Sequence, residues 1–79
     1  MAAQIAQRRE LADLLQRGIN LLPIEQRLTL VLSDVQGLRY DEIAEITHSK
    51  CSTIKSRLSR ARANLRDYVQ MNREAVWNV

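Results

Sequence analysis

Residues 51–69 read CSTIKSRLSRARANLRDYV, and their pattern indicates the longest helix of the chain. Its apolar residues recur at spacings of four, three and four, namely Ile54, Leu58, Ala61 and Leu65. At 100° per residue these positions fall within about 60° of one another, so they form one stripe of a helix. The stretch therefore predicts a long amphipathic helix from about Cys51 to about Val69.

The opposite face of this predicted helix carries small side chains: Ser52, Ser56, Ser59 and Ala63. Serine is a mediocre helix former, so three serines on one exposed face need a reason. Small side chains let a helix sit deep in the major groove of DNA, where hydroxyls can meet base edges. Cations beside them, such as Lys55 and Arg60, can then reach phosphates. The alternative is an ordinary basic helix face exposed to water.

Charge is unevenly distributed along the chain, although the net charge is only +3. Residues 49–66 hold six cations and no acid, whereas residues 25–45 hold five acids and two arginines. A concentrated basic segment is the expected electrostatic signature of a protein that binds a phosphate backbone. The distribution favours a nucleic-acid partner and assigns it to the long helix.

Three further helices are predicted before the long one. The first spans about 2–17, with Gly18 and Asn20 weakening its end, and the segment before Pro23 breaks it. The second starts at Pro23 and ends before Gly37; one apolar face is predicted for it, formed by Ile24, Leu28, Val31, Leu32 and Val35. The third covers about 40–47, with Tyr40, Ile43, Ala44 and Thr47 sharing a face. The fold class is therefore all-α, a single four-helix domain over residues 1–79 with a flexible tail at 72–79.

The short third helix, the polar connection 48–50 and the long basic helix together form a helix-turn-helix pattern over about 40–69. In that motif the second helix enters the major groove with its N-terminal part. Residues from about Cys51 to Arg60 are therefore placed to read bases.

Three segments make a specific resemblance: LPIEQR at 22–27, GLRYDEIAEI at 37–46 and TIKSRLSRAR at 53–62. Together they resemble region 4, the C-terminal promoter-binding domain of bacterial RNA polymerase sigma factors, and most of all the extracytoplasmic-function group. The likeness covers about 11–69. It implies recognition of the minus-thirty-five promoter element through the major groove of double-stranded DNA. It also implies docking on the β flap of RNA polymerase core, with an anti-sigma factor as a further partner, in the cytoplasm at the bacterial nucleoid.

The resemblance also suggests which residues contact DNA. Lys55, Ser56, Ser59 and Arg60 match the base-reading positions of the family. Thr53, Arg57 and Arg62 are better candidates for phosphates or for local helix contacts. Ser52 joins this set because it lies on the same small-residue face.

The chain departs from the family's pattern in the turn. His48 stands where glycine is common, in a turn that often needs a positive φ, which His tolerates less easily. Ser49 replaces a usual apolar residue, and Lys50 stands where a capping residue is common; a shift in the helix start would let Ser49 cap instead. Nothing here resembles the sigma domain that binds the polymerase clamp. The chain is therefore either an excised domain or a naturally small protein.

Catalysis, metals and membranes are not expected. One cysteine excludes an intramolecular disulfide, and His48 with Cys51 cannot supply the four ligands of a structural zinc site. There is no catalytic set and no glycine-rich phosphate loop, so we expect no enzyme and no cofactor. No apolar run approaches the roughly 20 residues of a membrane helix, so a soluble, cytoplasmic protein is expected.

Two alternatives stay open. One is a different helix-turn-helix regulator, such as the output domain of a response regulator. The other is a protein-interaction module, whose acidic and apolar second and third helices bind polymerase or an anti-sigma factor.

Overall fold

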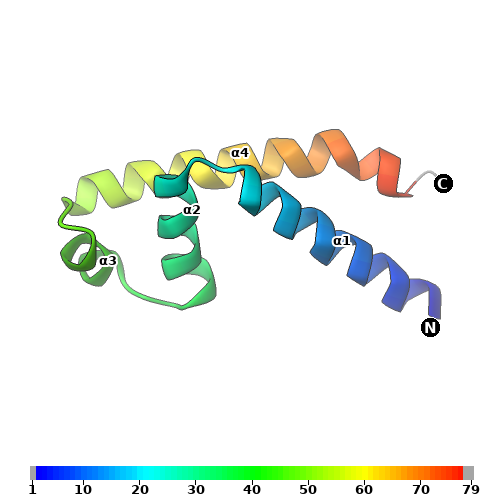
Figure 1. Cartoon of the computed structure of the whole chain (residues 1–79), viewed down its shortest axis with the longest axis horizontal. Coiled ribbons are helices and arrows are strands. Elements are labelled where there is room, and N and C mark those ends of the chain that lie inside the picture. The colour runs from blue at the N-terminus through cyan, green and yellow to red at the C-terminus, as the bar shows by residue number, and fades with distance from the viewer. Residues whose placement is uncertain (1, 78–79) are drawn as a thin grey trace.

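The computed structural model describes the backbone of residues 2–77 and the side chains of residues 4–73. Its helices are α1 (Ala2–Leu21), α2 (Ile24–Leu30), the π-helix η1 (Val31–Val35), α3 (Tyr40–Ile46) and α4 (Cys51–Trp77). No strand occurs in residues 2–77. The all-α prediction is confirmed, and α4 is the long element against which the others pack (Figure 1).

Helix α1 continues past Arg17, where the sequence suggested its end, to Leu21. Gly18 does not weaken it but lets it approach α4 closely. A Cβ atom at this position would lie 2.7 Å from side-chain carbons of both Leu65 and Tyr68. The predicted end was therefore wrong, because this glycine lies inside α1 at the point where α1 crosses α4. The two helices diverge beyond that crossing (Figure 1).

The second predicted helix is divided in two. Its first part, α2, is followed by the π-helical turn η1, in which the N–H of Gln36 donates to the carbonyl of Val31, five residues earlier, at 2.9 Å. Gly37, with a φ of +73°, then ends the element as predicted. The wider turn is a departure from the expected regular helix, and it carries Asp34 toward α4.

The predicted apolar face of this helix is wrong at three of its five positions, whereas Leu32 packs against the core and Val31 is half-buried. Ile24, Leu28 and Val35 are 67%, 47% and 65% exposed, whereas Thr29 and Leu30 are buried. Burial of Thr29 is possible because its hydroxyl donates to the carbonyl of Glu25 at 2.7 Å, so the polar group keeps a partner. Only one side of α2 lies against α4, and apolar residues on the other side stay at the surface.

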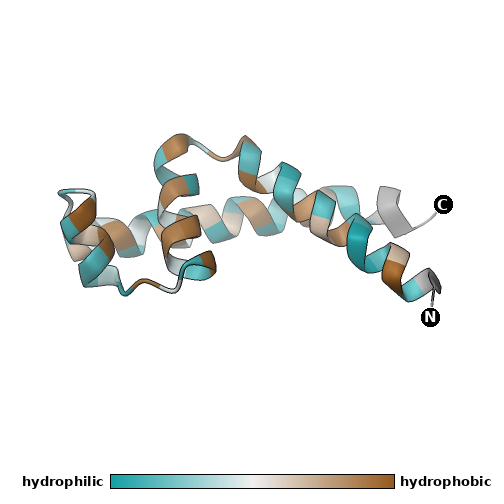
Figure 2. Ribbon diagram, turned by 60° about the horizontal axis from the view of Figure 1, so that its bottom comes forward, coloured by the Kyte–Doolittle hydropathy of each residue, from teal (hydrophilic) through white to brown (hydrophobic). Residues whose placement is uncertain are grey.

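The core lies between α4 and the helices that cross it. Its buried cluster consists of Leu22, Leu30, Ile43, Ala44, Ile54, Leu58 and Ala61, with Leu65 partly buried against it. The predicted stripe of α4 is therefore confirmed, and so is the inward face of α3, because Ile43 and Ala44 are buried. Hydrophobic and hydrophilic positions alternate along α4 accordingly (Figure 2).

The far end of α4 stays helical to Trp77, so the backbone of the predicted tail is helical up to that residue. Residues 78–79 lie outside the described part of the chain. Among the helices that the structure describes, none has the length and apolar character needed to cross a membrane.

Candidate nucleic-acid interface

The turn before α4 has a left-handed residue. His48 has a φ of +54°, and no other non-glycine residue in the described chain has a positive φ. The N–H of Ser49 donates to the carbonyl of Ala44 at 2.9 Å, which closes the turn back onto α3. The sequence-based concern about this position is thus justified: His48 takes the conformation that glycine adopts more easily. This turn sets the direction in which α4 leaves α3.

Helix α4 starts at Cys51, and the N–H of Ile54 donates to the carbonyl of Lys50 at 3.1 Å. Lys50 therefore occupies the N-cap position, and the shifted start that would let Ser49 cap the helix is not seen. Instead, the hydroxyl of Ser49 donates to the carbonyl of Thr47 at 3.3 Å and accepts from Nη1 of Arg57 at 3.2 Å. Ser49 thus makes two hydrogen bonds at the position where an apolar residue is usual in the family that the sequence resembles.

Five of the eight predicted site residues share one exposed surface of α4. They are Ser52, Lys55, Ser56, Ser59 and Arg60. At 100° per residue they fall within an arc of about 140°, which one groove of DNA can contact. Among the described residues, no ion pair engages Lys55 or Arg60. We call this set the reading surface.

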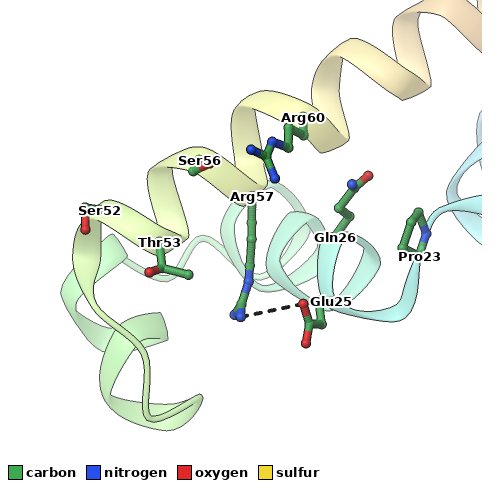
Figure 3. Close-up of a pocket in the computed structure, with 8 residues that line it drawn as sticks. All are labelled: Pro23, Glu25, Gln26, Ser52, Thr53, Ser56, Arg57 and Arg60. Carbon is green, nitrogen blue, oxygen red and sulfur yellow. Dashed lines mark ion pairs between the residues drawn. The ribbon is translucent and has the colours of Figure 1, made fainter.

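Thr53 and Arg57 lie at the edge of the reading surface and are partly buried. Arg57 extends from α4 toward the start of α2, where its Nη2 lies 3.6 Å from Oε2 of Glu25 (Figure 3). Because Nη1 also bonds Ser49, this guanidinium connects the turn, α4 and α2. At 100° per residue Arg57 lies between the exposed and the buried face of α4, which is where a residue in this bridging role has to stand.

Arg62 lies two turns beyond Lys55 on nearly the same side of α4, but its side chain binds η1. Its Nη2 lies 2.7 Å from Oδ1 of Asp34, and its Nε lies 3.2 Å from Oδ2, which is a two-pronged ion pair. The hydrogen bond from Arg62 holds the pKa of Asp34 below its ordinary value of 3.8, and the same bond raises the pKa of Arg62. Of the two roles considered for Arg62, the structure contains the local contact.

A pocket adjoins the reading surface on the side of α2. Its lining is shared by the two helices: Pro23, Glu25, Gln26, Ser52, Thr53, Ser56, Arg57 and Arg60. The α2 side chains reach it because α2 crosses α4 here (Figure 3), where Gln26 also accepts a 2.9 Å hydrogen bond from Asn64. Sequence reasoning missed the α2 members, since no local pattern marks a helix crossing between residues some thirty positions apart.

Among the residues that the structure describes, no group of three or more His, Cys, Asp or Glu side chains is placed to hold a metal ion. Cys51 is exposed at the start of α4 with a free thiol.

Comparison with known proteins gives matches to one family. The family model of Sigma-70, region 4 matches residues 12–65. The extracytoplasmic-function (ECF) sigma factor SigE of Mycolicibacterium smegmatis is 44% identical over 55 residues, which is 70% of this chain and 21% of that protein. The ECF sigma-E factor of Escherichia coli K12 is 38% identical over 61 residues, or 77% of this chain and 32% of that protein. The chain thus spans a third or less of these curated relatives.

Proposed function

The chain belongs to the Sigma-70, region 4 family, as its three motifs suggested, and from that premise we propose that it recognises promoter DNA. The reading surface would enter the major groove at the minus-thirty-five element. Docking on the β flap of RNA polymerase core would then direct transcription initiation, in the cytoplasm at the bacterial nucleoid. In this role the chain binds and positions its partners, and it performs no catalysis.

One observation carries the proposal. The small, hydroxyl-bearing residues Ser52, Ser56 and Ser59 are exposed on the first three turns of α4, with Lys55 and Arg60 beside them. Short side chains permit the helix backbone to approach base edges, and serine hydroxyls both donate and accept hydrogen bonds there. The neighbouring cations provide the attraction to phosphates that supplies most of the affinity.

The assignment of the predicted contacts follows the family resemblance, refined by the partial burial of Thr53 and Arg57 and by the ion pair of Arg62. We assign base contacts to Lys55, Ser56, Ser59 and Arg60, with Ser52 at the entry to the groove. Thr53 and Arg57 are assigned to the edge of the site, near a backbone phosphate. Arg62 is assigned to the contact with Asp34 and not to DNA.

A second candidate function has its own support. The apolar side chains of Ile24, Leu28 and Ile46 are exposed on α2 and α3, being 67%, 47% and 58% accessible. Exposed apolar residues gathered on neighbouring elements favour a protein contact. The alternative is therefore a module that binds polymerase or an anti-sigma factor through this surface, with DNA contact secondary.

Selection from a random duplex pool by the full chain tests the proposal. Enriched and unselected duplexes are then titrated at several salt concentrations. We expect a shared short sequence to be enriched, and weak binding whose logarithm falls steeply with the logarithm of salt, by about 0.9 for each phosphate contact.

Absence of duplex binding at low salt would contradict promoter recognition. If the same preparation bound purified polymerase core or an anti-sigma factor tightly, the interaction module would be the better description.

A further inference from the structure

The pocket beside the reading surface has one acidic residue, Glu25, among its lining side chains. Its side chain is 71% exposed, and its Oε2 lies 3.6 Å from Nη2 of Arg57. That distance is too long for a hydrogen bond, so the contact is a loose ion pair. We infer that Glu25 limits DNA affinity: its carboxylate competes with a backbone phosphate for the guanidinium of Arg57. This inference rests on the DNA recognition proposed above.

The position of Arg57 suits it to bind such a phosphate. Its side chain is only 26% exposed, and its Nη1 is held by Ser49, so the guanidinium has a fixed position at the edge of the pocket. A guanidinium carries five N–H donors, and a single hydroxyl leaves most of them for another acceptor. The group facing those donors in this structure is the carboxylate of Glu25 (Figure 3).

The carboxylate is a weak competitor. Ion pairs with a well-exposed member contribute little to stability, so a phosphate can displace Glu25 from Arg57. A guanidinium bonds a phosphate through two parallel N–H groups, which is a stronger contact than the present one. Once displaced, however, the carboxylate remains at the mouth of the same pocket, where it repels the phosphate.

Arg60 is a second cation that lines the pocket. It is exposed, and no ion pair engages it among the described residues. Two arginines therefore face a space that contains one opposing charge. Removing that charge, without changing the shape of the side chain, should leave the guanidinium of Arg57 to a backbone phosphate, with the charge of Arg60 nearby adding attraction.

The decisive experiment compares Glu25→Gln with Glu10→Gln in the full chain. Both changes add the same net charge, but Glu10 is an exposed residue of α1, whose N-terminal half diverges from α4 away from the pocket (Figure 1). The probe is a duplex of random sequence at low salt, because phosphate contacts carry no sequence information.

We expect Glu25→Gln to bind about three- to tenfold more tightly than the parent, with a salt slope steeper by up to about 0.9. Glu10→Gln should show much less gain and an unchanged slope. Equal behaviour of the two variants would overturn the inference and leave promoter recognition standing. If the parent chain did not bind the duplex at all, both promoter recognition and this inference would be overturned.

The same comparison in an Arg57→Gln variant tests whether Glu25 acts through Arg57. In Arg57→Gln, with the fold checked by circular dichroism, the extra gain from Glu25→Gln should fall to the level of Glu10→Gln. A gain that persists there would show that Glu25 acts through the general field and not through Arg57. Because Glu10 and Glu25 are both exposed, the first comparison decides the question even if Arg57→Gln fails to fold.

Discussion

Two parts of the same basic segment of α4 are used differently. Around residues 52–60, Lys55 and Arg60 are exposed beside a strip of serines, and no described ion pair engages them. Two residues after Arg60, Arg62 is held by both carboxylate oxygens of Asp34. These three cations look equivalent in the sequence. In the structure, however, Lys55 and Arg60 face solvent, whereas Arg62 forms an ion pair that connects α4 to η1. We therefore expect a cation of α4 to contact DNA unless a carboxylate of the fold holds it through two hydrogen bonds, as Asp34 holds Arg62.

The largest expected effect is at the centre of the reading surface. Ser56→Glu places a negative charge against the groove, and like-charge contact in an interface costs several kcal/mol, so DNA affinity should fall by more than about a hundredfold. Helix content should not change, because Ser56 is exposed. The measurement is duplex titration with circular dichroism as the folding check. Gln7→Glu on α1 is the matched control. Equal affinities of the two variants would mean that DNA does not contact the reading surface.

The difference between Lys55 and Arg62 is tested by the same substitution, to glutamine, at both positions. Lys55→Gln should weaken duplex binding by about tenfold and reduce the salt slope by about 0.9, because one cation of the reading surface is lost. Arg62→Gln should leave the slope almost unchanged when measured on folded protein. If Arg62→Gln reduced the slope as much as Lys55→Gln, the distinction between the two cations would be wrong.

The ion pair between Asp34 and Arg62 predicts a smaller effect, on the stability of the fold. Asp34→Asn should lower the free energy of unfolding by up to about 1 kcal/mol, since the pair it breaks is two-pronged but partly exposed. Urea denaturation of Asp34→Asn, Arg62→Gln and the double variant measures the coupling. We expect the double variant to lose less than the sum of the two single losses. Additive losses would mean that the pair contributes nothing.

The same pair predicts a pH dependence. Because the folded-state pKa of Asp34 lies below its ordinary value of 3.8, its contribution is present above that value and is lost as the pH falls through the folded pKa. Stability should therefore fall below about pH 4 more steeply in the parent than in Asp34→Asn. Thermal unfolding between pH 6 and pH 2 checks this; parallel curves would argue against the pair.

The smallest effect concerns the turn that aims α4. His48→Gly should raise the free energy of unfolding by about 0.5–1 kcal/mol, because glycine accepts the observed φ of +54° without steric cost. Lys50→Gly is the control, since its φ is not positive, and it should give no gain. DNA affinity should stay close to that of the parent in both variants. A loss of stability in His48→Gly would mean that the histidine ring makes a stabilising contact.

The sequence predicted what local periodicity controls. The stripe from Ile54 to Leu65 and the inward face of α3 depend only on residues three or four positions apart, and both were confirmed. Three of the five residues predicted for the apolar face of the second helix are exposed, because packing against α4, and not hydrophobicity alone, determines the buried side. Thr29 lies on that side, and its hydroxyl bonds a local carbonyl, so a polar residue could be buried there.

Parts of the candidate site depended on contacts between distant residues. Asp34 and Arg62 are 28 positions apart, and the π-helical turn that brings them together left no recognisable pattern in the sequence. Glu25 and Arg57 meet only because α2 crosses α4. The positive φ at His48 was expected only because glycine is common at this position in the family that the chain resembles.

The most direct test of the reading surface is residue-resolved. The amide resonances of the isotope-labelled chain are followed while a duplex selected from a random pool is added. We predict that the largest shifts fall on residues 52–60 of α4 and at the start of α2, with Asp34 and Arg62 little affected. Shifts concentrated instead on the exposed apolar residues Ile24, Leu28 and Ile46, or around Arg62, would contradict it.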